Sequence, residues 1–256
     1  MNKKKRLAAG IILIAAAAAL VCFFIFHYRD SRKTLHAYDE VQKSAHEDIS
    51  GEDQPDYLGL SIDFKTLKSE NPDTVGWILI PGTAVDYPIM QSAENEEEDY
   101  YLTHNFDRST GYPSCIYMQK TNASNFSDAV TILYGHNMKN GTMFASLHSY
   151  EDSDFFSRYP DIYVYTENAT YHYHVIASYE TKDDYLPSDY DSFDSPADVL
   201  KYQKWLLAQG KKSGCVDGSV SSLSVTDKIL TLSTCVSGKS DRRFLVQAQM
   251  TELIAR

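Results

Sequence analysis

Residues 229–235 run Ile229-Leu230-Thr231-Leu232-Ser233-Thr234-Cys235, an apolar segment that is rich in strand-favouring residues and ends in a thiol. We expect this segment to form a buried strand that brings Cys235 to its end. A short polar loop follows, then Arg242 and Arg243, and a second apolar run from Phe244 to Ala248. The two runs predict a hairpin that holds a thiol beside a fixed positive charge.

A pattern typical of β-strands extends back from this hairpin to about residue 75. Short apolar runs alternate with turn residues such as Pro81-Gly82, and eight of them qualify as strands: Trp77 to Ile80, Val85 to Met90, Ile116 to Met118, Ala129 to Tyr134, Ile162 to Tyr165, Tyr171 to Tyr179, Ile229 to Ser233 and Phe244 to Met250. Strands of this length and spacing are typical of a barrel or a sandwich. The sequence therefore predicts a mainly β domain.

Helices are expected at three places around these strands. Asp63 is a suitable N-cap for a helix that ends at Glu70. A second helix would bury one face, formed by Met143, Leu147 and Tyr150. A third would begin at Ser195-Pro196-Ala197-Asp198, with proline at its first position, and Gly210 is a plausible residue just past its end.

The N-terminal segment has the pattern of a membrane anchor. Leu7 to Phe26 contains no charged residue, and four basic residues precede it directly: Lys3, Lys4, Lys5 and Arg6. About 20 apolar residues cross a bilayer, and flanking positive charge favours a cytoplasmic N-terminus. We expect a single-pass protein of the cell membrane with a cytoplasmic tail (1–6), a transmembrane anchor (7–26), a stalk with an N-terminal helix (27–55) and an extracellular domain (56–256). A cleavable signal peptide is the alternative, because Ala15 to Ala19 offers small residues.

Charge and cysteine content limit the possible functions. The chain has 35 acidic against 24 basic residues and a formal net charge of −11, which argues against a nucleic-acid partner. Four cysteines are too few for a disulfide scaffold of this size. Cys22 lies in the predicted anchor, so Cys115, Cys215 and Cys235 leave at least one external thiol free. Cys235 could still be a buried small hydrophobe or a partner of Cys215.

A thiol becomes a nucleophile with the help of a base, and His136 is the best candidate. It follows a predicted strand in Tyr134-Gly135-His136-Asn137, where a side chain can project over the sheet end. The rival histidines are His104, which could line a groove, His148, on a helix, and His172 and His174, which would suit a metal pair but lack a third ligand at a recognisable spacing. Gly-x-Ser-x-Gly, Walker A and His-Glu-x-x-His sequences do not occur, so a serine hydrolase or a nucleotide enzyme is unsupported.

With these residues in place, the chain resembles the sortases, membrane-anchored cysteine transpeptidases of Gram-positive bacteria, and class B in particular. The resemblance covers about residues 56–256 and is carried by Thr231 to Cys235, Arg243-Phe244, Tyr134 to Tyr150 and Val75-Gly76-Trp77-Ile78. It implies an eight-stranded sortase-type β-barrel with N-terminal helices and an added helix between strands 6 and 7, which residues 195–209 match.

The resemblance also implies roles for individual residues. Cys235 matches the nucleophile and His136 the general acid/base. Arg243 matches the catalytic arginine because it directly precedes a phenylalanine, and strand alternation allows only one of the two arginines to face the thiol. The substrate-binding residues are expected to be Ser233 and Thr234. Val236 departs from the family pattern, which often has an acidic or polar residue after the cysteine.

The implied reaction is acyl transfer through a thioester on Cys235. The enzyme would cleave a C-terminal sorting motif, similar to Asn-Pro-x-Thr, in secreted proteins and join them to an amine of a cell-wall peptidoglycan precursor. It would need no cofactor and no metal. Two alternatives are a cysteine hydrolase of the same fold, which releases the peptide to water, and a non-catalytic surface binding module.

Overall fold

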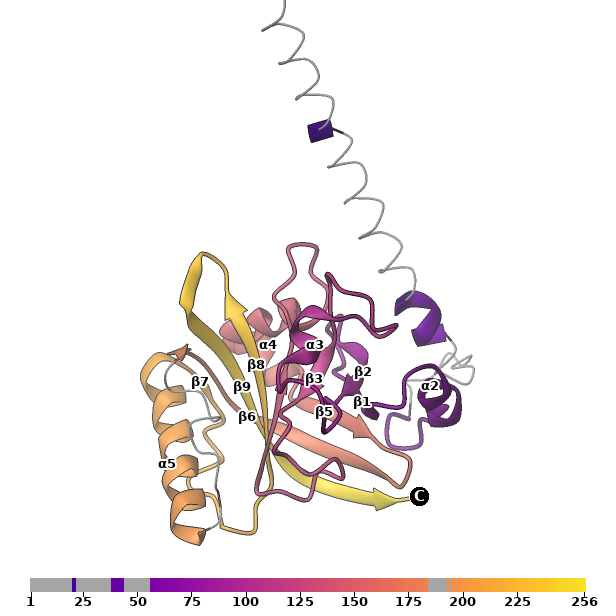
Figure 1. The fold of residues 1–256 in the computed structure, drawn as a ribbon. Coiled ribbons are helices and arrows are strands. Elements are labelled where there is room, and N and C mark those ends of the chain that lie inside the picture. The colour runs from indigo at the N-terminus through magenta and orange to yellow at the C-terminus, as the bar shows by residue number, and fades with distance from the viewer. Residues whose placement is uncertain (1–19, 22–37, 44–55, 184–192, 194) are drawn as a thin grey trace, which may run out of the picture. The chain divides into compact units, whose positions relative to one another are not determined.

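The computed structural model describes residues 20–21, 38–43, 56–183, 193 and 195–256. The chain divides into two compact units, Met1–Glu40 and Val41–Arg256. In the first unit, the described residues 20–21 and 38–40 are helical. The second unit carries all of the strands that the structure describes (Figure 1).

Eight strands of the described part of the chain form a closed barrel. They pair in the order β5-β1-β2-β3-β4-β8-β9-β6, and β6 pairs again with β5 to complete the ring. Their bounds are β1 (Thr74–Leu79), β2 (Asp86–Met90), β3 (Ile116–Met118), β4 (Val130–Tyr134), β5 (Asp161–Tyr165), β6 (Ala169–Lys182), β8 (Ile229–Val236) and β9 (Lys239–Ala255). The predicted β-barrel is confirmed, and each of the eight apolar runs lies on one of these strands.

The two longest strands, β6 and β9, run the length of the barrel side by side (Figure 1). They are antiparallel and pair from Ala169 with Ala255 to Lys182 with Arg242. A ninth strand, β7 (Gly214–Val216), pairs with β6 outside the ring. Sequence patterns did not predict β7, because Gly214-Cys215-Val216 is short and, unlike the three residues of β3, begins with glycine and is not an apolar run.

Within residues 56–183 and 195–256, five helices accompany the strands: α2 (Phe64–Glu70), α3 (Tyr100–Thr103), the 3-10 helix η1 (Phe144–Glu151), α4 (Ser153–Arg158) and α5 (Pro196–Ser213). The predicted N-cap of α2 is confirmed, since Asp63 Oδ1 accepts from Thr66 N at 3.0 Å. Bonds from the Thr66 hydroxyl and amide lower the pKa of the Asp63 carboxyl. The predicted face of Met143, Leu147 and Tyr150 is buried, but in a 3-10 helix.

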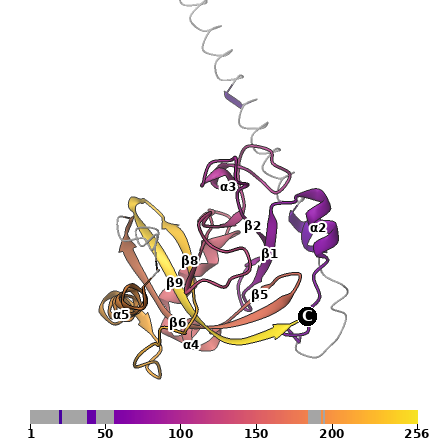
Figure 2. The ribbon, with the colours of Figure 1, turned by 60° about the horizontal axis from the view of Figure 1, so that its bottom comes forward.

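Helix α5 lies alongside β6 and β7 on the outside of the barrel (Figure 2). Its predicted N-cap is confirmed by a bond from Asp198 N to Ser195 Oγ at 3.2 Å. The predicted end was wrong, because the helix continues past Gly210 to Ser213. A Cβ at position 210 would lie 2.8 Å from the carbonyl oxygen of Cys215. Gly210 therefore allows the helix to approach β7 closely and does not terminate it.

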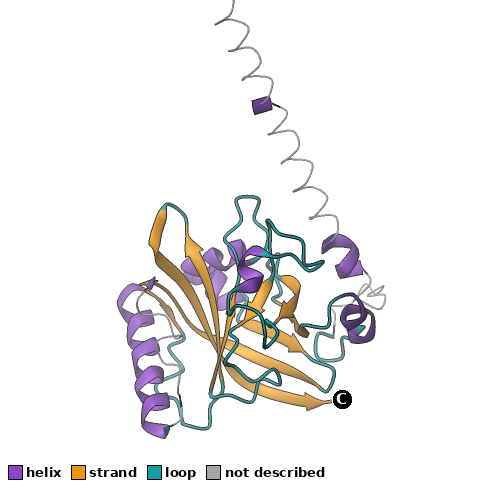
Figure 3. Cartoon of the chain, in the orientation of Figure 1, coloured by secondary structure: helices purple, strands orange, loops and turns teal. Residues whose placement is uncertain are grey.

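Aromatic and aliphatic side chains fix α5 on the barrel. Tyr202 and Leu206 of the helix are fully buried in one cluster with Tyr179 of β6 and Leu245 of β9. Burying each such side chain stabilises the fold by about 1.5–3 kcal/mol. The helix therefore covers the outer side of the strands as a fixed part of the domain (Figure 3).

The predicted location in the cell membrane requires correction. Among the residues that the structure describes, no helix is both long enough and apolar enough to cross a bilayer. A crossing takes about 20 apolar residues, whereas the longest described helix, α5, has 18 residues and includes four lysines. The predicted anchor (7–26) lies outside the described residues except for Leu20 and Val21. The expected cytoplasmic N-terminus and extracellular domain depended on that anchor and are withdrawn.

The predicted stalk falls mostly outside the described residues as well. Residues 38–43 are helical, which agrees with the helical spacing expected there. The boundaries at 27–55 and 56–256 stay predictions.

Candidate active site

Cys235 lies exposed at the end of β8. Strand β9 runs antiparallel beside it, and the register puts Arg243 directly opposite Cys235. Cross-strand partners share a face of the sheet, whereas successive residues alternate between faces. Cys235 and Arg243 are therefore on one face, and Arg242 belongs to the other.

Strand β4 brings His136 to the same end of the barrel. It runs parallel to β8, with Tyr134 opposite Ser233 as the last pair. Beyond that pair, Gly135 N donates to Ser233 O at 3.2 Å, and Thr234 Oγ1 donates to Gly135 O at 2.8 Å. A Cβ at position 135 would lie 2.5 Å from Ile116 Cδ1, so only glycine fits here. His136 thus leaves β4 where β8 reaches Cys235.

The His136 ring is held by two neighbours from the segment between β2 and β3: Leu102 in α3 and Tyr112 beyond it. Its Nε2 lies 2.7 Å from the carbonyl oxygen of Leu102, and Tyr112 packs edge-on with ring centroids 5.1 Å apart. A carbonyl oxygen only accepts hydrogen bonds, so Nε2 carries the hydrogen in this contact. In the neutral ring, Nδ1 is then the nitrogen that can accept a proton.

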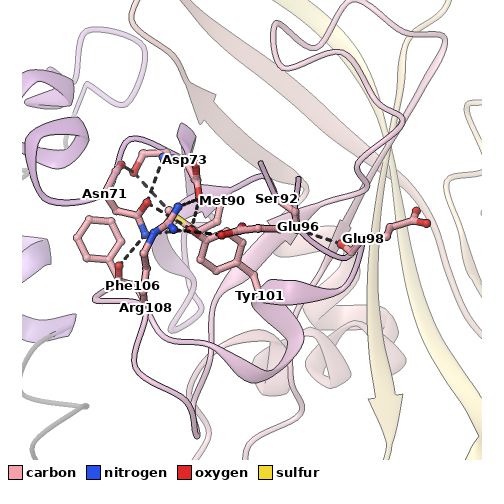
Figure 4. Close-up of polar contacts among 10 residues, drawn as sticks. Asn71, Asp73, Met90, Ser92, Glu96, Glu98, Tyr101, Phe106 and Arg108 are labelled. Carbon is pink, nitrogen blue, oxygen red and sulfur yellow. Dashed lines mark hydrogen bonds and ion pairs between the residues drawn. The ribbon is translucent and has the colours of Figure 1, made fainter. Parts of the chain in front are cut away.

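A buried polar network fixes the segment that carries Leu102 (Figure 4). Tyr101, in α3, is fully buried, and its hydroxyl donates to Asp73 Oδ2 at 2.7 Å. Asn71 Nδ2 donates to the Tyr101 hydroxyl at 3.0 Å and to Phe106 O at 2.7 Å. Arg108 forms ion pairs with Asp73 and, at 3.1 Å, with Glu96.

This network explains how such a short helix can be a stable support. A four-residue helix is not stable alone and depends on tertiary contacts. Burial raises the pKa of the Tyr101 hydroxyl well above its ordinary value, and the bond to Asp73 raises it further. The hydroxyl therefore stays protonated and keeps donating. The carbonyl of the next residue, Leu102, is held in place for His136.

The two arginines have different partners. Arg243 Nη2 lies 3.0 Å from Asp183 Oδ2, and its Nη1 donates to Ser240 O at 3.2 Å and Arg242 O at 3.0 Å. Arg242 Nε lies 3.3 Å from Glu180 Oε1. Each guanidinium is thus paired with a different acid of the β6 end.

Tyr117 is a buried tyrosine near these strand ends. Burial raises the pKa of its hydroxyl above the ordinary value, and the charges of Tyr134, Asp99 and Cys235 raise that pKa further, whereas the charge of Arg243 lowers it.

Two residues beside Cys235 were not predicted as part of the site. Asn137 Nδ2 donates to the carbonyl oxygen of Cys235 at 2.9 Å, and His148 Nε2 lies 3.1 Å from the same oxygen. His148 was expected only to lie on a helix, yet its side chain is near Cys235 and only 23% exposed. Its place next to Cys235 depends on the packing of η1 against β8 and β9, which no local pattern reveals.

The predicted substrate-binding residues, Ser233 and Thr234, are each only 2% exposed. Ser233 Oγ is buried and has no hydrogen-bond partner among the described residues. Thr234 Oγ1 is used in the bond to Gly135. Their roles toward substrate stay predictions.

Helix α5 covers the face of β8 and β9 that also carries Cys235 and Arg243. Its Tyr202 hydroxyl lies 3.0 Å from Thr231 Oγ1 and 3.2 Å from Gln247 Oε1, two cross-strand partners on that face. At the C-terminal half of the helix is a cavity of about 730 Å³, whose lining includes Trp205, Gln209, Lys182 and Arg242. The helix therefore forms one side of a hollow next to the strand ends.

The remaining cysteines and histidines have the following contacts. Cys115, Cys215 and Cys235 are all free thiols, so Cys235 is not a disulfide partner of Cys215. His172 pairs with Asp161 at 2.8 Å, whereas His174 pairs with Asp217 at 3.3 Å. The described residues contain no group of three or more His, Cys, Asp or Glu placed to hold a metal ion.

Comparison with known proteins agrees with this geometry. A sequence model of the sortase domain matches residues 78–251. Sortase B of Listeria monocytogenes is 35% identical over 195 residues, which cover 73% of this chain and 74% of that protein.

Solved structures give the same result. The chain is similar to the X-ray structure of Clostridium perfringens sortase B, with a TM-score of 0.64, 31% identity and coverage of 73% of this chain and 99% of that one. It is also similar to a Staphylococcus aureus sortase B-substrate complex, with a TM-score of 0.63, 29% identity and coverage of 74% and 84%.

Proposed function

The chain belongs to the sortase family as a class B cysteine transpeptidase, and from this premise we propose that Cys235 is its nucleophile, His136 its general acid/base and Arg243 its oxyanion donor. One observation carries the proposal: the strand register sets Cys235 opposite Arg243, and β4 delivers His136 to the same end. The resemblance of the sequence to class B supports the same three residues.

In the first half-reaction, the Cys235 thiolate attacks the threonine carbonyl of an Asn-Pro-x-Thr-like motif in a secreted protein. The carbonyl oxygen gains negative charge, and Arg243 stabilises it with fixed donors. The peptide bond then breaks, and protonated His136 gives its proton to the leaving amine. The products are a thioester on Cys235 and a free C-terminal fragment.

In the second half-reaction, an amine of a cell-wall peptidoglycan precursor attacks the thioester. His136 accepts the proton from the attacking nitrogen as the new amide bond forms. The Cys235 thiolate leaves, and the enzyme returns to its starting state. The secreted protein is now joined to the cell-wall peptide.

Two features of the structure bear on substrate binding. The Arg243 guanidinium has five donors, and its present acceptors are one carboxylate and two backbone carbonyls. A substrate oxygen would replace Asp183 as an acceptor. The buried hydroxyl of Ser233 would gain a partner from the substrate backbone, because an unpaired buried polar group costs about 1–3 kcal/mol. Thr234 would act by holding Gly135 and hence His136.

The test is cleavage of a quenched fluorescent peptide with an Asn-Pro-x-Thr motif, with and without a peptide amine such as triglycine. We expect cleavage by the purified chain and a joined product when the amine is present. Cys235→Ala and His136→Ala should each abolish cleavage, whereas Cys115→Ala and Cys215→Ala should remain active.

The same assay separates the alternatives. A cysteine hydrolase would release the peptide at the same rate without amine and give no joined product. A binding module would hold the peptide without cleaving it, and Cys235→Ala would bind equally well. Retention of more than a few per cent of activity by either site variant would remove that residue from the mechanism.

A further inference from the structure

The carbonyl oxygen of Cys235 is held by side chains where a neighbouring strand has ended. The last backbone bond between β4 and β8 runs from Gly135 N to Ser233 O. Alternate carbonyls of a strand point the same way, so Cys235 O faces this side too, one step beyond the end of β4. Asn137 Nδ2 and His148 Nε2 reach it at 2.9 and 3.1 Å and take the place of a strand.

The His148 ring is itself fixed from two further sides. Its Nδ1 lies 2.7 Å from Glu151 Oε1. Its ring stacks on Phe244, with centroids 4.8 Å apart and planes at 27°. Phe244 follows Arg243 in β9 and pairs with Thr234. The ring therefore touches the strand of the thiol and the strand of the arginine.

The hydrogens available in this cluster decide which protonation form of the His148 ring can donate to Cys235 O. Glu151 only accepts when it is ionised, so Nδ1 carries a hydrogen. Asn137 Nδ2 has two hydrogens for three neighbours: Cys235 O, Ser237 Oγ at 3.2 Å and His148 Nε2 at 3.0 Å. In the neutral ring, Nε2 accepts one of these hydrogens and has none to give to Cys235 O. In the protonated ring, Nε2 donates to Cys235 O, and Asn137 keeps its two hydrogens for Cys235 O and Ser237 Oγ.

We propose that His148 is a positioning residue for the transpeptidation reaction, which in its protonated form holds the carbonyl of Cys235 together with Asn137. The inference rests on the proposed role of Cys235 as nucleophile. Holding this carbonyl fixes the last peptide unit before the hairpin and thereby the direction of the thiol toward His136 and Arg243. Small errors in such a direction slow a reaction strongly, because reacting atoms must be aligned closely.

The chain provides a matched control for this proposal. His172 has a similar bond to a carboxylate, at 2.8 Å to Asp161, and its side chain is 21% exposed against 23% for His148. It lies in β6 opposite Tyr163 of β5, and β9 separates β6 from β8 in the pairing order. His148→Leu and His172→Leu each remove one histidine–carboxylate pair, so the effect of losing such a pair on stability should be similar in both variants.

The experiment compares His148→Leu, His148→Gln and His172→Leu in the full-length chain. It measures the pH profile of Cys235 alkylation by iodoacetamide, kcat and KM for the Asn-Pro-x-Thr peptide, and the thermal midpoint. His148→Leu should lower kcat about tenfold with little change in KM, since one bond to a positioned group is lost. It should also change the pH profile of Cys235 alkylation, because the ring that bonds the Cys235 carbonyl is lost. His148→Gln offers an amide N–H near the place of Nε2 and should restore most of kcat.

Three results would overturn the inference. His148→Leu could keep wild-type kcat and alkylation, His148→Gln could be as slow as His148→Leu, or His172→Leu could be equally slow. Cys235→Ala is measured in parallel to separate the two proposals. If Cys235→Ala still cleaves, the proposed nucleophile is wrong; if it is inactive while His148→Leu is normal, only the positioning role fails.

Discussion

Arg242 and Arg243 are adjacent and carry the same charge, yet they belong to opposite faces of β9. Only Arg243 is the cross-strand partner of Cys235. Arg243→Ala should lower turnover by about 10² to 10³, the usual loss for one oxyanion donor. Arg243→Lys should recover only part, because lysine lacks the planar fork of donors.

Arg242→Ala is the control for that prediction. Its ion pair with Glu180 is at the surface, and such pairs contribute about 0–1 kcal/mol. Turnover should therefore stay within about tenfold of the wild type. Measuring the three variants on one peptide decides between the arginines, and a crippled Arg242→Ala with an active Arg243→Ala would reverse the assignment.

At the scale of single residues, the sequence was informative where chemistry is local. Cys235 ends a strand-forming run, and alternation along the next run distinguishes Arg243 from Arg242. Leu102 and His148 could not be found in this way. Leu102 contacts His136 through its own backbone carbonyl, and His148 contacts the backbone carbonyl of Cys235. Every residue type has a backbone carbonyl, so the sequence does not reveal such contacts.

At the scale of elements, α3 depends on the network around Tyr101. Tyr101→Phe removes the hydroxyl that joins Asp73 and Asn71 and leaves both polar groups buried with one partner fewer. The free energy of unfolding should fall by about 1–3 kcal/mol, as measured by urea denaturation. Peptide turnover should fall as well, because the Leu102 carbonyl loses its support.

Tyr100→Phe is the neighbouring control. The Tyr100 ring stacks on His104 with centroids 3.8 Å apart, and the guanidinium carbon of Arg108 lies 5.9 Å from the centroid of the Tyr100 ring. These are ring contacts that phenylalanine keeps. Unfolding free energy within about 0.5 kcal/mol of the wild type is expected, and an equal loss in both variants would contradict the role given to the Tyr101 hydroxyl.

Gly210 gives a second prediction at this scale. In an exposed helix, Gly→Ala stabilises by about 1 kcal/mol. Here the new Cβ would meet Cys215 O at 2.8 Å and Ala177 Cβ at 3.1 Å, so Gly210→Ala should destabilise the domain by about 1–3 kcal/mol. Gly218→Ala, where nothing lies within 4 Å, should be close to neutral. A stabilised Gly210→Ala in urea denaturation would show that α5 is less tightly packed than described.

Element bounds show what a sequence pattern can and cannot reveal. The N-caps of α2 and α5 were predicted correctly because Asp63 and Ser195 act on their own first turns. The end of α5 was predicted wrongly because Gly210 is required for close packing against β7 and does not end the helix. No signal in the sequence indicated β7. Local signals therefore located helix starts, whereas tertiary packing decided a helix end.

At the scale of the whole molecule, barrel closure brings the site together. Strands β4, β8 and β9 are neighbours in the ring, although residue 136 is about a hundred positions before residue 235. The eight barrel strands were readable from the sequence as apolar runs, whereas β7 was not. The parallel pairing of β4 with β8 aligns His136 with Cys235, and no local pattern in the sequence predicts it. Only the resemblance to sortases indicated that these two residues act together.

The central claim is that the acyl group passes through Cys235, and trapping the intermediate tests it most directly. The full-length chain is mixed with the Asn-Pro-x-Thr peptide without amine, quenched in acid, digested and analysed by mass spectrometry. We expect the N-terminal fragment ending in threonine to be attached to the digest peptide that contains Cys235 and to be released by hydroxylamine. An adduct on Cys115 or Cys215, or cleavage that persists in Cys235→Ala, would contradict it.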